Sequence, residues 1–193
     1  MVSTSVNFLL NLNLSVCLSV TRSWKRLLES SHKLWTTLDT THVKKVISQK
    51  SLQSHFRRSN WTLERAILSV KSVDAQRLVY ITKHCKMLKE LQMYGRGMIG
   101  DSLTSALSNA KGLETLYVSR NTEMTLAAVQ SALRLCKDSL VTITVLKITG
   151  PRGGFLAGKW PEMGSIKALN LESDGESVLD IVSILTWMKN ILK

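Results

Sequence analysis

The sequence predicts an α/β fold, a solenoid in which strand-turn-helix units of 25–27 residues follow one another along the chain. Three observations predict it. An apolar pattern recurs at nearly constant spacing, and patterns typical of amphipathic helices lie between its copies. The composition, with 44% hydrophobic and 21% charged residues in a chain of 193, is that of a protein that buries a core.

The recurring pattern is apolar-x-x-apolar-x-apolar. Its copies begin at Leu63, Leu88, Leu113, Leu140 and Ile166, at steps of 25, 25, 27 and 26 residues. A weaker copy begins at Trp35, 28 residues before the first. Because alternate residues of a strand point to opposite faces, each copy predicts one strand with its apolar members buried. The steps fall within the range of about 20–29 residues that is typical of leucine-rich repeats.

Helical patterns occupy the intervals between these strands. Residues 74–87, 126–136 and 178–188 each place apolar side chains three and four residues apart, as one face of a helix does. A further helix is expected over residues 44–58, ahead of the first full copy. Since one such unit cannot bury its apolar face alone, we expect the units to stack on one continuous core.

The charge is strongly basic and uneven. The chain carries 26 Lys and Arg against 14 Asp and Glu, a formal charge of +12. Residues 21–70 hold ten basic and three acidic side chains, a net charge of +7. No recognised nucleic-acid-binding motif accompanies this excess, so we interpret it as a solvated basic face and expect no nucleic-acid partner.

The three cysteines, Cys17, Cys85 and Cys136, form neither a C-x-x-C pair nor a zinc-ligand spacing. Cys85 and Cys136 each end a predicted helix shortly before the next strand, which favours buried structural thiols. An odd number of cysteines without a disulfide framework favours a reducing compartment, so the expected location is cytoplasmic or nuclear. No segment has enough uninterrupted apolar residues to predict a membrane-spanning helix.

Residues 17–35 resemble the second half of an F-box. They read Cys17-Leu-Ser-Val-Thr-Arg-Ser-Trp-Lys-Arg-Leu-Leu-Glu-Ser-Ser-His-Lys-Leu-Trp35, similar to that family's V-[ST]-[RK]-x-W-x-x-L-L helix and the short S-S-x-x-L-W segment after it. Residues 49–58 resemble the linker of fungal F-box/leucine-rich-repeat proteins. The resemblance implies an incomplete helical F-box over residues 1–38, a linker helix over 39–60 and leucine-rich repeats over 61–193. Since the expected Leu-Pro-x-Glu start and a further strand are missing, we expect a chain truncated at both ends.

This resemblance implies a substrate-recognition subunit of a cullin-based (SCF-type) ubiquitin ligase. In that family the F-box docks on a small adaptor subunit and the repeats hold the substrate protein. The positions that match the adaptor-binding pattern are Trp24, Leu27, Leu28, Leu34 and Trp35. Because the F-box is incomplete, we expect adaptor binding to be weakened.

The expected substrate surface is the strand face opposite the buried leucines, since side chains alternate away from the core. Its predicted members are Gln92, Tyr94, Tyr117, Ser119, Thr144, Leu146, Asn170 and Glu172. Tyr94 and Tyr117 are the preferred anchors, because tyrosine is enriched at binding hot spots. The sequence contains no recognisable catalytic set or metal-ligand cluster, so we expect no catalysis, no cofactor and no metal.

Two alternatives remain open. The runner-up is a leucine-rich-repeat interaction scaffold that has no ligase role. The other alternative is a nucleotide-binding enzyme, because Gly95-Arg-Gly-Met-Ile-Gly100 matches G-x-G-x-x-G between a predicted strand and a predicted helix.

Overall fold

The computed structural model describes Arg26 and residues 30–98, 100–119, 122–149, 155–156, 165–173 and 178–179. The strands are β1 (Thr37–Asp39), β2 (Arg65–Ser69), β3 (Glu90–Tyr94), β4 (Gly97–Met98), β5 (Thr115–Val118), β6 (Thr122–Thr125), β7 (Thr142–Thr149), β8 (Phe155–Leu156), β9 (Ala168–Ser173) and β10 (Val178–Leu179). The helices are the short 3₁₀ helix η1 (His32–Trp35) and the α-helices α3 (Gln49–Arg58), α4 (Ala75–His84), α5 (Gly100–Leu107) and α6 (Leu126–Leu135).

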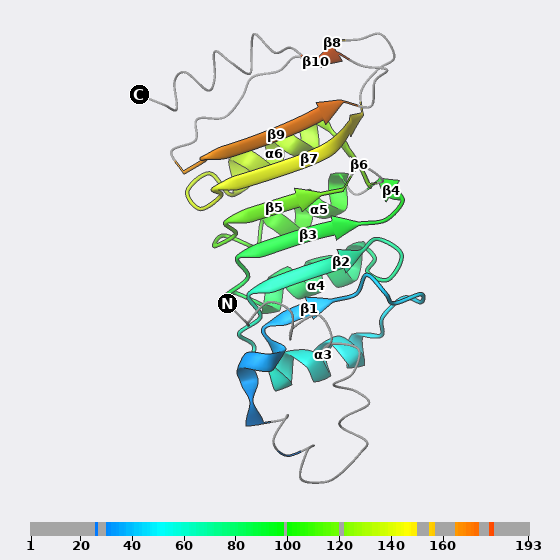
Figure 1. Ribbon diagram of the computed structural model, residues 1–193, viewed down its shortest axis with the longest axis vertical. Helices are drawn as coiled ribbons and strands as arrows, with labels where there is room; N and C mark the ends of the chain where they lie inside the picture. The colour runs from blue at the N-terminus through cyan, green and yellow to red at the C-terminus, as the bar shows by residue number, and fades with distance from the viewer. Residues whose placement is uncertain are drawn as a thin grey trace, which may run out of the picture.

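Eight strands form one sheet, in which every pairing is parallel. Strands β1, β2, β3, β5, β7 and β9 make a continuous ladder in chain order, while β6 and β4 extend from the end of β7. The four α-helices lie along one side of the ladder, and its other side carries no helix among the described residues (Figure 1).

The predicted strands are confirmed at every copy of the apolar pattern. Ala66, Leu91, Leu116, Ile143 and Leu169 are neighbours in register across β2, β3, β5, β7 and β9. The first four are completely buried against the helices. The constant step along the chain therefore becomes straight rows of apolar side chains across the sheet, which share one core.

The helices are shorter than the apolar spacing predicts: α3 at its start, where a side-chain cap fixes the first residue, and α4 at its end, at His84. The hydroxyl of Ser48 accepts a hydrogen bond from the backbone N–H of Ser51 at 3.1 Å, so α3 begins at residue 49 and not at 44. Asp74 caps α4 through the N–H of Arg77 at 2.9 Å. These capped starts place each helix directly behind its strand.

The expected fold class, a leucine-rich-repeat solenoid preceded by a partial helical F-box, is wrong. The structure is a mixed α/β arrangement, Rossmann-like in its six-stranded all-parallel ladder and four accompanying helices. The apolar pattern caused the error, because alternation and a strand-to-strand step are shared by parallel α/β sheets in general. Residues 30–38 also differ from a helical F-box: after η1 the chain enters β1, which pairs with β2.

The core is continuous across the region boundaries expected at residues 38 and 60. Leu38 of β1 and both Leu52 and Phe56 of α3 belong to the same buried cluster as Leu91 and Leu116. The helix expected over residues 178–188 is wrong at its start, since Val178–Leu179 form a strand that pairs with β8. The described helices include none with the length and apolar character to cross a membrane.

Candidate functional site

The candidate site is the side of the ladder that the helices leave uncovered, which we call the open face. It is formed by the residues that alternate with the buried ones on each strand. One row across it, set by the pairing register, consists of Asp39, Ile67, Gln92, Tyr117, Thr144 and Asn170. A parallel row consists of Thr37, Arg65, Glu90, Thr115, Thr142 and Ala168.

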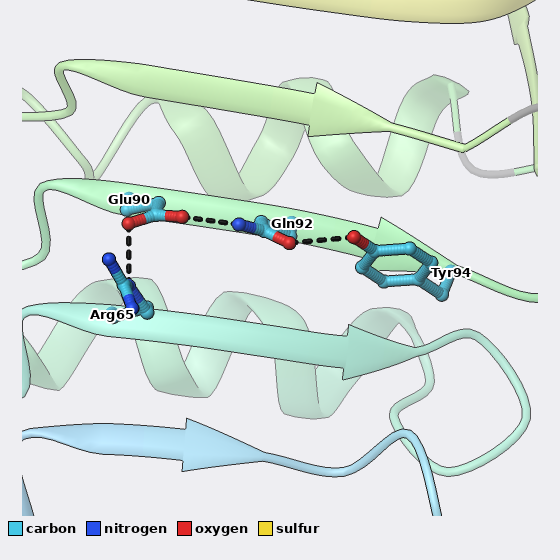
Figure 2. Close-up of polar contacts among 4 residues, drawn as sticks. All are labelled: Arg65, Glu90, Gln92 and Tyr94. Carbon is cyan, nitrogen blue, oxygen red and sulfur yellow. Dashed lines mark hydrogen bonds and ion pairs between the residues drawn. The ribbon is translucent and has the colours of Figure 1, made fainter. Parts of the chain in front are cut away.

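A chain of polar contacts organises the middle of the open face (Figure 2). Arg65 on β2 donates from Nε to Oε2 of Glu90 on β3 at 2.6 Å. Gln92 donates through Nε2 to Oε1 of Glu90. The Tyr94 hydroxyl donates in turn to Oε1 of Gln92 at 2.7 Å. These contacts hold four neighbouring side chains in one arrangement before any ligand binds. The side chains therefore lose less conformational entropy when a ligand binds.

The contact chain ends at a pair of tyrosines. The ring centroids of Tyr94 and Tyr117, on the neighbouring strands β3 and β5, are 5.3 Å apart with an interplanar angle of 34°. Burial raises the pKa of the Tyr94 phenol above its usual value, and the nearby Tyr117, Asp39 and Glu90 raise it further. The Tyr94 phenol therefore stays protonated at neutral pH, and the two rings offer an aromatic surface to a ligand.

The charge of the open face is opposite in sign to that of the whole chain. Among the described strand residues that face this side, the carboxylates are Asp39, Glu90 and Glu172, and the cation is Arg65. One cation against three carboxylates leaves this face at −2, while the chain carries +12. These strand residues therefore differ in sign from the chain as a whole.

The structure brings most of the predicted substrate-binding residues together on this face. Those that share it are Gln92, Tyr94, Tyr117, Thr144, Leu146, Asn170 and Glu172, all partly or fully exposed. Ser119 differs, because it is only 8% exposed. Its hydroxyl lies 3.2 Å from that of Thr122, so it serves the turn after β5 and is unavailable to a partner.

The structure describes two of the five predicted adaptor-binding residues, Leu34 and Trp35. Trp24, Leu27 and Leu28 lie outside the described residues. Leu34 is half-buried, and Trp35 is 3% exposed. The Trp35 ring meets the edge of His55, with centroids 5.5 Å apart, and the Arg58 guanidinium carbon lies 4.8 Å from the centroid of the Trp35 ring. Trp35 is thus a core residue beneath α3, and an adaptor cannot contact it without opening that packing.

The buried histidine beside Trp35 is kept neutral. Burial lowers the pKa of His55 from 6.5 to about 4, and the charge of Arg58 acts in the same direction. Hydrogen bonds with the backbone of Trp35 and Thr37 oppose this shift without reversing it.

The glycine loop Gly95–Gly100 serves the fold. Gly95 has a φ of +109°, a conformation that favours glycine, and its carbonyl accepts a hydrogen bond from the Thr122 hydroxyl at 2.7 Å. A Cβ at Gly100 would lie 3.2 Å from the Cβ of Ala128, so glycine there allows α5 to approach α6.

A pocket of about 800 Å³ lies at the start of α5, and the described residues that line it are Ala75, Gln76, Val79, Gly100, Asp101, Ser102, Ser105 and Thr125. Gly95 is not among them. Dinucleotide sites form where the strand order of a parallel sheet reverses, whereas the described ladder runs in chain order. The described residues therefore do not assemble the phosphate-binding site that the glycine motif suggested.

The predicted buried cysteines are confirmed where the structure describes them. Cys85 and Cys136 are free thiols, 1% and 2% exposed. Burial raises their pKa values to about 12 and about 11. Neither thiol forms a nucleophile at neutral pH. The described residues include no cluster of three His, Cys, Asp or Glu side chains able to hold a metal ion.

Among the open-face residues that sequence reasoning missed, the charged ones are Asp39, Arg65 and Glu90. The signal was present, because Glu90 lies two residues before Gln92 on the same strand, Arg65 pairs with Glu90, and Asp39 lies in the same row as Gln92. Counting back along each strand by the same alternation finds them.

Comparison with known proteins assigns nothing further, since no family model matches the chain and no curated protein matches it.

Proposed function

We propose that this chain is the substrate-binding subunit of a cullin-based ubiquitin ligase and that its open face holds the target protein. The observation that carries the proposal is the uncovered sheet face with the Tyr94–Tyr117 pair at its centre. Tyrosines are enriched at protein interfaces, where they supply large contact area at low conformational cost.

The form of the open face favours a protein ligand over a small molecule. Small molecules are usually held in concave pockets that cover most of their surface. The open face instead spreads its side chains over five neighbouring strands, from Asp39 on β1 to Thr144 on β7, in one continuous row. At about 4.8 Å between strands, such a row spans roughly 20 Å, which is close to the width of a standard protein interface.

The ligase assignment rests on the F-box-like segment of residues 17–35. In this proposal Trp24, Leu27 and Leu28 contact the adaptor subunit, and Trp35 anchors the segment to α3 from inside. The chain performs no chemistry: holding the target near the ubiquitin-transferring enzyme makes the encounter effectively intramolecular. The proposed compartment is the cytoplasm or the nucleus.

Photo-cross-linking in cells tests the substrate face. A benzoylphenylalanine at position 94 probes the open face, and one at position 134, exposed on α6, is the matched control on the helix side. We expect position 94 alone to yield adducts with identifiable proteins, and the ubiquitylation of those proteins to fall when the chain is removed. Equal adducts from both positions, or targets whose ubiquitylation is unaffected, contradict the proposal.

The adaptor contact is tested separately by pull-down with purified adaptor. The Leu27→Ala/Leu28→Ala variant should lose capture, and Leu135→Ala, at an exposed leucine of α6, should keep it. If wild-type protein captures no adaptor while the open face still binds targets, the chain is an interaction scaffold without a ligase role.

A further inference from the structure

In the contact chain on the open face, hydrogen bonds are donated from Tyr94 to Gln92 and from Gln92 to Glu90. This direction of donation leaves the Tyr94 oxygen as a hydrogen-bond acceptor at the end of the contact chain. Glu90 accepts from both Arg65 and Gln92, which turns the Gln92 amide nitrogen toward the carboxylate. The Gln92 amide oxygen therefore faces Tyr94 and accepts a hydrogen bond from its hydroxyl at 2.7 Å. With its only proton committed, the Tyr94 oxygen presents lone pairs to a ligand.

The charges around the tyrosines are negative. The phenol of Tyr94 experiences the carboxylates of Asp39 and Glu90, both of which raise its pKa. Asp39 accepts two hydrogen bonds from Thr41, both at Oδ1. The backbone N–H donates at 2.9 Å and the hydroxyl at 2.7 Å, and together they hold the carboxylate in place on this face. Aromatic ring faces are negative as well. Lone pairs, rings and carboxylates together favour a cationic hydrogen-bond donor.

We propose that the Tyr94–Tyr117 pair, on the same face of the sheet as the Asp39 carboxylate, is a receptor for an arginine or lysine side chain of the bound protein. This inference rests on the proposed function, because it names the residue type by which the target is held. The cation lies against the tyrosine rings and donates to the Tyr94 oxygen, and the Asp39 carboxylate on the same face favours its positive charge.

An anionic ligand fits this site poorly. The face carries −2, and the Arg65 guanidinium that would attract an anion is paired with Glu90 at 2.6 Å. A chain with a net charge of +12 repels a basic segment at long range, so its binding depends on the local negative charge of this face.

Selection from a phage-displayed library of random twelve-residue peptides tests the inference. The purified chain is immobilised, and the Tyr94→Ala/Tyr117→Ala variant in solution removes peptides that bind elsewhere. Enriched peptides are then synthesised with arginine, with its neutral isostere citrulline, and with lysine or acetyl-lysine. We expect a shared basic residue and roughly tenfold weaker binding after its neutralisation.

Variants of the protein supply the complementary measurement. Asp39→Asn should weaken the arginine peptide by roughly fivefold to tenfold and leave the citrulline peptide unchanged. Asp138→Asn is the matched control, since it removes the same charge from an exposed turn after α6 and should change neither affinity. Thermal melting of each variant establishes that it is folded.

The outcomes separate the two proposals. Tyrosine-dependent peptides that bind equally with citrulline, or that are acidic, overturn the cation receptor and leave the open face as a protein-binding surface. Failure to enrich any peptide that depends on the tyrosines overturns both.

Discussion

The two sides of the same strands differ in what they are made of. On β3, Leu91 and Met93 are 0% and 1% exposed beneath the helices, while Glu90, Gln92 and Tyr94 alternate with them on the open face. The buried side repeats, since nearly every strand supplies an aliphatic residue at the same register position. The open side does not repeat: position by position it holds a carboxylate, an aliphatic, an amide and a phenol. Stability therefore depends on the first side and recognition on the second.

The largest change in the free energy of unfolding is expected from a substitution on the buried side of the strands. Leu116→Ala removes a completely buried side chain at the centre of the ladder and should lower the free energy of unfolding by about 4 kcal/mol. Thr115→Ala, its neighbour on the open face, should change it by less than about 0.5 kcal/mol. Urea unfolding measures the free energy of unfolding of both variants. Equal decreases would show that the two sides of the strands contribute equally to stability.

Acid should weaken the helix-covered side through His55. The folded pKa is about 4 and the unfolded value is 6.5, so the unfolded chain binds the proton first as the pH falls. Stability is therefore fully present above about pH 6.5 and is lost progressively toward pH 4. The loss amounts to about 3 kcal/mol, from 2.5 pKa units at about 1.36 kcal/mol each.

Urea unfolding at pH 7 and pH 4.5, with His55→Gln as the comparison, measures this term. The variant should be less stable at pH 7 but should lose less stability on acidification. An unchanged pH dependence in His55→Gln would assign the acid sensitivity to other groups.

On the open face, truncation should affect binding more than folding. Tyr94→Ala should weaken a bound target by about 2 kcal/mol, because a central tyrosine anchor is removed. Its effect on the free energy of unfolding should be smaller, since the ring rests on an uncovered surface. Tyr94→Phe keeps the ring and isolates the contribution of the hydroxyl. Titration calorimetry with a selected peptide, beside thermal melting, separates the two; a large loss of stability with unchanged affinity would reverse the assignment.

The smallest expected effect belongs to the ion pair between Arg65 and Glu90. The Arg65 side chain is 47% exposed, so solvent screens the attraction and the pair should contribute about 0.5 kcal/mol to stability. A double-mutant cycle with Arg65→Ala and Glu90→Ala measures this coupling. A coupling above about 2 kcal/mol would mean that the open face also supports the fold.

Reading the sequence located the strands and part of the candidate site because both follow from local rules. A strand buried on one side needs an aliphatic residue at every second position, which Leu91 and Met93 display without reference to the rest of the chain. The same alternation placed Tyr94 and Tyr117 on the opposite side, and the step of 25 residues placed them on neighbouring strands. Helix positions were found less well: the cap at Ser48 set the start of α3, and Val178–Leu179, where a helix was expected to begin, form a strand.

What only the tertiary structure decided depends on partners distant in the sequence. The fold class was one such property, since the apolar period is compatible with several parallel architectures and the pairing of β1 with β2 makes residues 37–39 part of the sheet. Trp35 was another: its match to an adaptor-binding pattern is local, but its burial depends on His55 and Arg58 of α3, about 20 residues away. The contact of Arg65 with Glu90 likewise joins residues 25 apart. Sequence alone determines which face of a strand a side chain occupies, because that is set by the period of two. It does not determine what lies opposite that face, because that is set by the packing of the whole chain.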